Sequence, residues 1–83
     1  MSESKTEVIL YGKKGCCLCD KAKQIIQKVQ QQYPLTLLEV DITGDPELME
    51  KYQFLIPVIA VNGQDTFISE VSESDFRSFL ARQ

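Results

Sequence analysis

Apolar and polar residues form alternating blocks along the chain, and each block has the period of one kind of secondary structure. Residues 7–11 form a near-continuous apolar run, which predicts a strand buried on both faces. In residues 17–32 the apolar positions recur at helical spacing, which predicts an amphipathic helix. Pro34 then ends this helix, because the residue before a proline is driven out of the helical region. The chain therefore opens with a strand, a loop and a long helix.

The middle of the chain repeats this order with shorter elements. Residues 35–42 are rich in leucine and β-branched side chains and predict a second strand. Asp45 is a favourable N-cap and Pro46 suits a first helical position, so a short helix is expected up to about Tyr52. Residues 56–61 predict a third strand, which is entered through a proline. Successive strand–helix units predict right-handed crossovers, with the first three strands parallel.

A hairpin and a final helix complete the predicted order. Asn62-Gly63 is a strong signal for a type I′ turn, and residues 64–69 would form the antiparallel partner strand. Ser72 and Asp75 have the spacing of a capping box, which predicts the start of a helix. The order β-α-β-α-β-β-α predicts an α/β fold, with a four-stranded mixed sheet flanked by three helices.

Length, charge and hydropathy narrow the class of protein. The 83 residues suit one small domain, which we expect at residues 7–83 after a disordered tail at residues 1–6. A net charge of −3 argues against nucleic acid and anionic membranes as main partners. The longest apolar run, residues 54–61, is too short to span a bilayer. Residues 1–7 lack the apolar part of a secretion signal, so we expect a cytoplasmic location with reduced thiols. We also expect the protein to be a monomer.

All three cysteines lie between the first predicted strand and the first predicted helix. Cys16 and Cys19 are three positions apart, so at a helix start they are close enough to form a disulfide. Cys17 faces away from Cys19 and is too close to Cys16 for an unstrained bond. The spacing therefore predicts a redox pair formed by Cys16 and Cys19, with Cys17 as an accessory residue.

The helix start also predicts different roles for the two thiols. The helix N-terminus carries a partial positive charge that favours the thiolate of Cys16, and Lys13 and Lys14 lie close in sequence. Cys19 lies one turn into the helix, nearer its apolar side, and should be more buried and less ionised. We expect Cys16 to attack a disulfide and Cys19 to resolve the resulting mixed disulfide.

A soft-metal carrier is the alternative interpretation of the same residues. Cys16 and Cys19 could hold copper(I) or zinc, as Cys-x-x-Cys pairs do in small metal carriers. The chain has no histidine, and its three thiols are one short of a four-cysteine zinc site. A weaker alternative is an iron–sulfur cluster shared between two chains. The main prediction includes no bound metal or cofactor.

The segment from Tyr11 to Cys19 resembles the strand, loop and helix start of glutaredoxins, which belong to the thioredoxin superfamily. Ile56-Pro57-Val58 is similar to the segment in which that superfamily places a cis-proline opposite the cysteine pair. The resemblance covers the chain from Glu7 onward. It implies a thioredoxin-like fold and a thiol–disulfide oxidoreductase whose partners are disulfide-containing proteins or glutathione.

The resemblance also implies roles for individual residues. Cys16 would be the nucleophile and Cys19 the resolving thiol. Lys13 falls where glutaredoxins place a lysine that meets a carboxylate of glutathione, a possible co-substrate. The residues expected to contact substrate are Tyr11, Lys13, Ile56 and Pro57.

Two regions depart from the glutaredoxin pattern. Glutaredoxins usually carry proline and an aromatic residue between the cysteines, where this chain has Cys17 and Leu18. They also have a Gly-Gly segment after the hairpin that receives the other end of glutathione. Glu70 and Glu73 occupy that region here, and their charges would repel a carboxylate.

Overall fold

The computed structural model describes residues 6–82 and contains all the predicted elements in the predicted order. The elements are β1 (Thr6–Gly12), α1 (Cys17–Gln30), β2 (Leu35–Asp41), the 3₁₀ turn η1 (Ile42–Gly44), α2 (Pro46–Tyr52), β3 (Val58–Val61), β4 (Gln64–Ile68) and α3 (Glu73–Ala81). Residues 1–5 of the predicted tail lie outside the described residues, and its last residue, Thr6, already belongs to β1. Between residues 6 and 82, no helix has the length and apolar character needed to cross a membrane.

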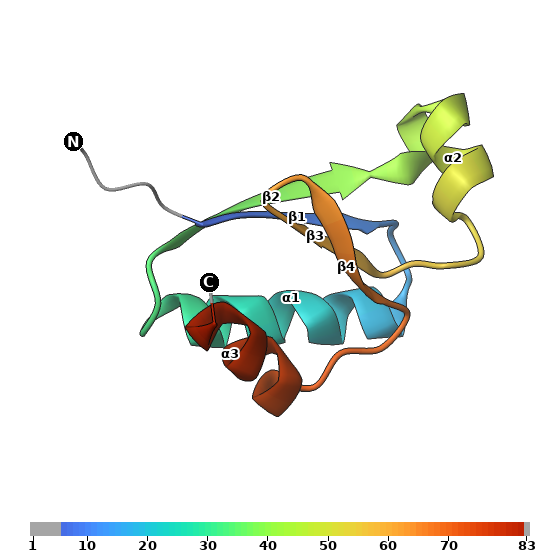
Figure 1. Ribbon diagram of the computed structural model, residues 1–83. Helices are drawn as coiled ribbons and strands as arrows, with labels where there is room; N and C mark the ends of the chain where they lie inside the picture. The colour runs from blue at the N-terminus through green and yellow to red at the C-terminus, as the bar shows by residue number, and fades with distance from the viewer. Residues whose placement is uncertain (1–5, 83) are drawn as a thin grey trace.

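The sheet is four-stranded and mixed, as predicted, with the strand order β2-β1-β3-β4. β1 and β2 are parallel, and β4 is antiparallel to β3. β3, however, runs antiparallel to β1, so the prediction that the first three strands are parallel is wrong. The seven-residue α2 lies near the sheet edge where β2 ends and does not run back along the sheet (Figure 1). The chain therefore re-enters the sheet from that edge, and Val58 pairs with Tyr11.

The helices cover the two faces of the sheet unequally. α1 and α3 lie side by side on one face and bury the main core (Figure 1). The fully buried side chains between these helices and the sheet include Val8, Ile26, Val29, Ile59 and Phe76. On the other face, α2 contributes Tyr52, which stacks on Tyr11 with ring centroids 4.6 Å apart. β1 is thus buried toward α1 but only half-buried toward α2, contrary to the expectation of burial on both faces.

Local capping and turn signals act as the sequence predicts. The Asp45 carboxylate caps α2 by accepting hydrogen bonds from the backbone N–H groups of Glu47 and Leu48. The Ser72 hydroxyl oxygen caps α3 by accepting the Asp75 N–H at 3.0 Å. Asn62 and Gly63 both have positive φ, 52° and 86°, as a type I′ turn requires. α1 ends two residues before its predicted end, and β3 begins at Val58 rather than at residue 56.

Phe76 and Phe54 provide a matched test of this core. Phe76 is fully buried against α1 and the sheet, whereas Phe54 is 88% exposed. We expect Phe76→Ala to lower the free energy of unfolding by about 3–5 kcal/mol, because it leaves a cavity in the packed core. Phe54→Ala should change it by about 0.5 kcal/mol or less. Urea denaturation of both variants measures the difference, and equal losses would contradict the assigned core.

Candidate active site

Cys16 occupies the N-cap of α1, where its sulfur takes the place of the usual hydroxyl or carboxylate cap. Its backbone is extended, and its Sγ accepts a hydrogen bond from the Cys19 N–H at 3.2 Å. The preceding Gly15 has a φ of 80°, which a residue with a side chain rarely adopts, and so allows the turn into the helix. A sulfur in this position accepts a backbone hydrogen bond and lies at the positive end of the helix dipole.

Cys19 lies one turn further along α1 in a different environment. Its side chain is buried, with 6% of its surface exposed. Burial raises the pKa of the Cys19 thiol from 9.0 to about 11, and the hydrogen bond with Cys16 adds to this effect. The backbone N–H of Lys13 acts in the opposite direction. Cys19 is therefore a neutral thiol at neutral pH, and it is more buried and less ionised than an exposed cysteine, as its place in the helix predicts.

Gly12, at the end of β1, makes this packing possible. A Cβ atom at this position would lie 2.9 Å from the Cys19 Sγ and 3.2 Å from the Cys19 Cβ. These separations are shorter than van der Waals contact, so only glycine lets β1 and α1 approach this closely. The strand predicted at residues 7–11 stops one residue short of Gly12, and no role was predicted for this glycine. The glycine between the predicted strand and the cysteines was the sequence feature that could have indicated this close contact.

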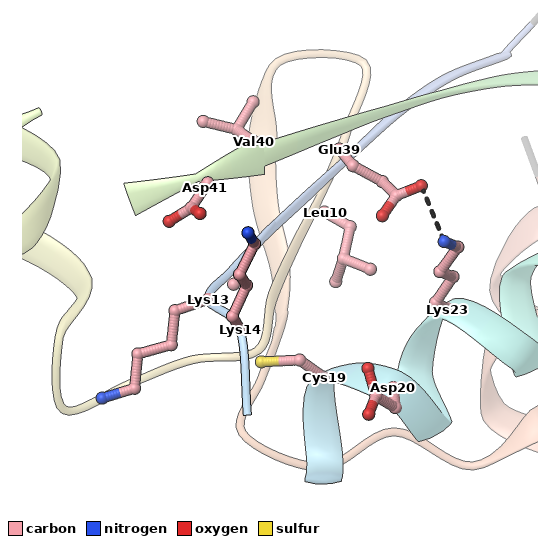
Figure 2. A pocket seen from close by; sticks show the side chains of 10 residues that line it. Leu10, Lys13, Lys14, Cys19, Asp20, Lys23, Glu39, Val40 and Asp41 are labelled. Atoms are coloured by element: carbon pink, nitrogen blue, oxygen red, sulfur yellow. Dashed lines mark ion pairs between the residues drawn. The ribbon is translucent and has the colours of Figure 1, made fainter. Parts of the chain in front are cut away.

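A pocket of about 300 Å³ lies beside Cys19, between the start of α1 and the ends of β1 and β2 (Figure 2). It is lined by Leu10, Gly12, Lys13, Lys14, Cys19, Asp20, Lys23, Glu39, Val40 and Asp41. Neither Cys16 nor Cys17 lines it, so Cys19 is the one cysteine that this pocket reaches.

Three carboxylates and three lysines surround the pocket. Lys23 on α1 and Glu39 on β2 form an ion pair with a 3.3 Å separation. Asp41 accepts hydrogen bonds from the Thr43 N–H at 2.9 Å and the Thr43 hydroxyl at 2.6 Å, which lower the pKa of its carboxyl group. Lys23 and Glu39 were not predicted to belong to the site. They meet there because α1, which carries Lys23, and β2, which carries Glu39, both pack against β1.

The residues expected to contact substrate lie at the same edge of the sheet as the cysteines, but in different surroundings. The Ile56–Pro57 peptide bond is cis, and the Pro57 carbonyl accepts the Ser69 N–H at 2.8 Å. Lys13 is exposed and lines the pocket. Tyr11 stacks on Tyr52, on the side of the sheet away from α1. Their contact with a substrate stays a prediction.

Cys17, the accessory residue of the sequence analysis, is exposed at the first position of α1. Its thiol, like those of Cys16 and Cys19, is free. Across residues 6–82, no group of three or more histidine, cysteine, aspartate or glutamate side chains is arranged to hold a metal ion. The soft-metal alternative would therefore rest on two thiolates, those of Cys16 and Cys19.

The sheet, the flanking helices and a Cys-x-x-Cys pair at the head of α1 define a thioredoxin-fold protein with a dithiol site. The model of the family described as "Glutaredoxin-like domain (DUF836)" matches residues 7–81, and the chain belongs to this family. Solved structures share the fold. Protein Ne2328 from Nitrosomonas europaea matches with a TM-score of 0.80 at 17% identity, over 95% of each chain. Thioredoxin-2, a component of malaria parasite protein secretion machinery, has a TM-score of 0.75 at 20% identity, over 100% of this chain and 87% of that one.

A curated relative has a similar length but no described activity. The uncharacterized protein Rv0508 of Mycobacterium tuberculosis (strain ATCC 25618 / H37Rv) is 24% identical over 84 residues, which cover 95% of this chain and 87% of the relative. The family and the fold are thus shown by the comparisons, whereas the reaction has to be argued from the site.

The pKa of Cys19 gives a prediction for alkylation of the folded, reduced protein. At pH 8, three units below the pKa of about 11, roughly 0.1% of Cys19 is thiolate. Alkylation of Cys19 by iodoacetamide should therefore be slow at pH 8 and accelerate up to about pH 11. The exposed Cys17 is the internal control, and peptide mass mapping measures both rates. Equal rates for Cys19 and Cys17 at pH 8 would show that the Cys19 thiol is not buried as described.

The same shift has a consequence for stability. Because the folded state raises the pKa of Cys19, folding favours the protonated thiol. The stability that this thiol contributes is fully present below about pH 9 and is lost as the pH rises through about 11.

Replacement of Gly12 tests the close contact between β1 and α1. Gly12→Ala should lower the free energy of unfolding by about 1–3 kcal/mol, because the added methyl group overlaps the Cys19 sulfur. Gly44→Ala is the control, since a Cβ atom there would meet nothing within 4 Å. Thermal denaturation of both variants is the measurement. If Gly12→Ala is as stable as Gly44→Ala, the two elements are not in the contact described.

Proposed function

We propose that this protein is a thiol–disulfide oxidoreductase that reduces disulfides of proteins or small molecules with its Cys16–Cys19 pair. The observation that carries the proposal is the position of the Cys16 sulfur. It caps α1, 3.2 Å from the Cys19 N–H, beside a second thiol that is buried and neutral. Membership of the glutaredoxin-like family supports the same reaction.

In the first step the Cys16 thiolate attacks one sulfur of the substrate disulfide. A bond forms between the Cys16 Sγ and that sulfur, the substrate disulfide bond breaks, and the other substrate sulfur leaves as a thiolate that takes up a proton. The helix N-terminus stabilises the attacking thiolate before substrate arrives. The product is a mixed disulfide between Cys16 and the first half of the substrate.

In the second step Cys19 resolves the mixed disulfide. Its thiol loses a proton, and the thiolate attacks the Cys16 Sγ and expels the remaining substrate sulfur. The two protein thiols have then supplied two electrons and form a Cys16–Cys19 disulfide. Because its high pKa keeps Cys19 protonated, it does not compete with Cys16 for the incoming substrate.

The remaining features of the proposal follow from the sequence analysis. The substrate lies against Tyr11, Lys13, Ile56 and Pro57, and glutathione is a candidate co-substrate. Cys17 is an accessory thiol outside the reaction. The protein acts as a monomer in the reducing environment of the cytoplasm, where its pair can be returned to the dithiol form.

Serine substitutions test the assigned roles. Cys16→Ser should reduce the rate of insulin disulfide reduction to that seen without protein, because the nucleophile is lost. Cys19→Ser should accumulate a mixed disulfide that mass spectrometry detects as an adduct on Cys16. Cys17→Ser is the matched control and should keep the wild-type rate.

Two outcomes would refute the proposed roles. Full activity of Cys16→Ser would exclude Cys16 as the nucleophile. If the wild-type protein forms no intramolecular disulfide in any glutathione redox buffer, the redox proposal fails, and copper(I) titration would then test the soft-metal alternative.

A further inference from the structure

The resolving step leaves one chemical requirement unmet. Cys19 is buried and protonated, and it must release its proton before it can attack the Cys16 sulfur. Gly12 covers part of its sulfur, and Cys16 lies one turn before it, at the N-cap of α1. The pocket beside Cys19 offers an opening through which this proton can leave.

Three carboxylates line that pocket, and two of them are engaged. The Asp41 carboxylate is held by both hydrogen-bond donors of Thr43, and the Glu39 carboxylate by Lys23 across the pocket. Asp20 forms no ion pair within residues 6–82 and accepts no hydrogen bond from them. Figure 2 shows Asp20 beside Cys19 on the first turn of α1, whereas Asp41 and Glu39 lie on β2.

We propose that the Asp20 carboxylate accepts the proton of Cys19 during resolution, through water in the pocket. The proposal deepens the proposed function, on which it rests. The pocket has polar walls and room for several water molecules, which allows a relay between thiol and carboxylate. The proton leaves the Cys19 Sγ and arrives at Asp20, and the electron pair left on sulfur forms the bond to Cys16. Asp20 then returns the proton to bulk water, since its side chain is exposed.

Other charged groups around Cys19 modulate this transfer. The connecting loop contributes Lys13 and Lys14, β2 contributes Glu39 and Asp41, and α1 contributes Lys23, while Cys16 carries no thiol because it is held in the mixed disulfide. The Asp20 charge itself raises the pKa of Cys19. A purely electrostatic role of Asp20 would therefore oppose resolution, and its removal would speed the step. A role as proton acceptor predicts the opposite sign.

The test separates the two chemical steps within one experiment. In a Cys17→Ser background, the reduced protein is mixed with 5,5′-dithiobis(2-nitrobenzoate). Attack by Cys16 releases the first coloured thiolate, and resolution by Cys19 releases the second. Asp20→Asn should slow the second phase at pH 7 by about 100-fold, a typical lower value for general base catalysis. The first phase should change by less than about twofold, since Asp20 does not act in it.

The pH profile and matched variants distinguish proton transfer from a structural effect. The defect of Asp20→Asn should shrink as the pH rises, because a growing fraction of Cys19 then ionises without an acceptor. Asp20→Glu should restore much of the second phase. Asp41→Asn is the control. It changes another pocket carboxylate, one that already accepts hydrogen bonds from Thr43.

The possible outcomes all decide the proposal. A second phase that is unchanged or faster in Asp20→Asn overturns it, as does an equal slowing of both phases. A defect that does not vary with pH also overturns it. If the Cys17→Ser protein itself shows no second phase, Cys19 is not the resolving thiol, and the failure lies in the proposed function.

Discussion

The closeness of β1 and α1 at Gly12 is the constraint on which the candidate site depends. With no Cβ at this residue, the Cys19 sulfur can lie directly against the end of β1. That contact sets how far the first turn of α1 lies from the sheet. It therefore buries Cys19, and it leaves the adjoining pocket beside the ends of β1 and β2. A side chain of any size at this residue would push the helix start outward and expose the second thiol.

One helical turn then places two chemically identical side chains in different surroundings. Cys16 lies at the helix N-terminus, where backbone N–H groups are unpaired and a negative charge is stabilised. Cys19 faces the sheet and has lost most of its contact with water, so its neutral form is favoured. Burial is the largest cause of the raised pKa of Cys19, and the neighbouring Cys16 and Asp20 add to it. The distinction arises from the helix itself and from the face that its hydrophobic stripe turns toward the core.

The features that could be predicted from sequence are those determined by neighbouring residues. Asp45 and Ser72 cap their helices through backbone groups two or three residues away, and Asn62-Gly63 forms its turn without help from other segments. The contributions of Gly12, Lys23 and Glu39 could not be predicted in the same way. Lys23 and Glu39 meet only because β1 and β2 pair in parallel and α1 packs across them. Residues 16 positions apart along the chain carry no local signal of such an encounter.

The direction of β3 could not be predicted from the order of strands and helices alone. A parallel third strand over the same stretch of β1 would begin beside Val8 rather than Tyr11, at the end of the stretch away from the cysteines. Pro57, which immediately precedes β3, would then lie far from Cys16. Because β3 is antiparallel to β1, its first residue, Val58, pairs with Tyr11, next to the cysteine loop. The similarity of Ile56-Pro57-Val58 to the cis-proline segment of the superfamily therefore already required an antiparallel β3. The prediction of a parallel β3 assumed that the second helix crosses back along the sheet, which the seven-residue α2 does not do.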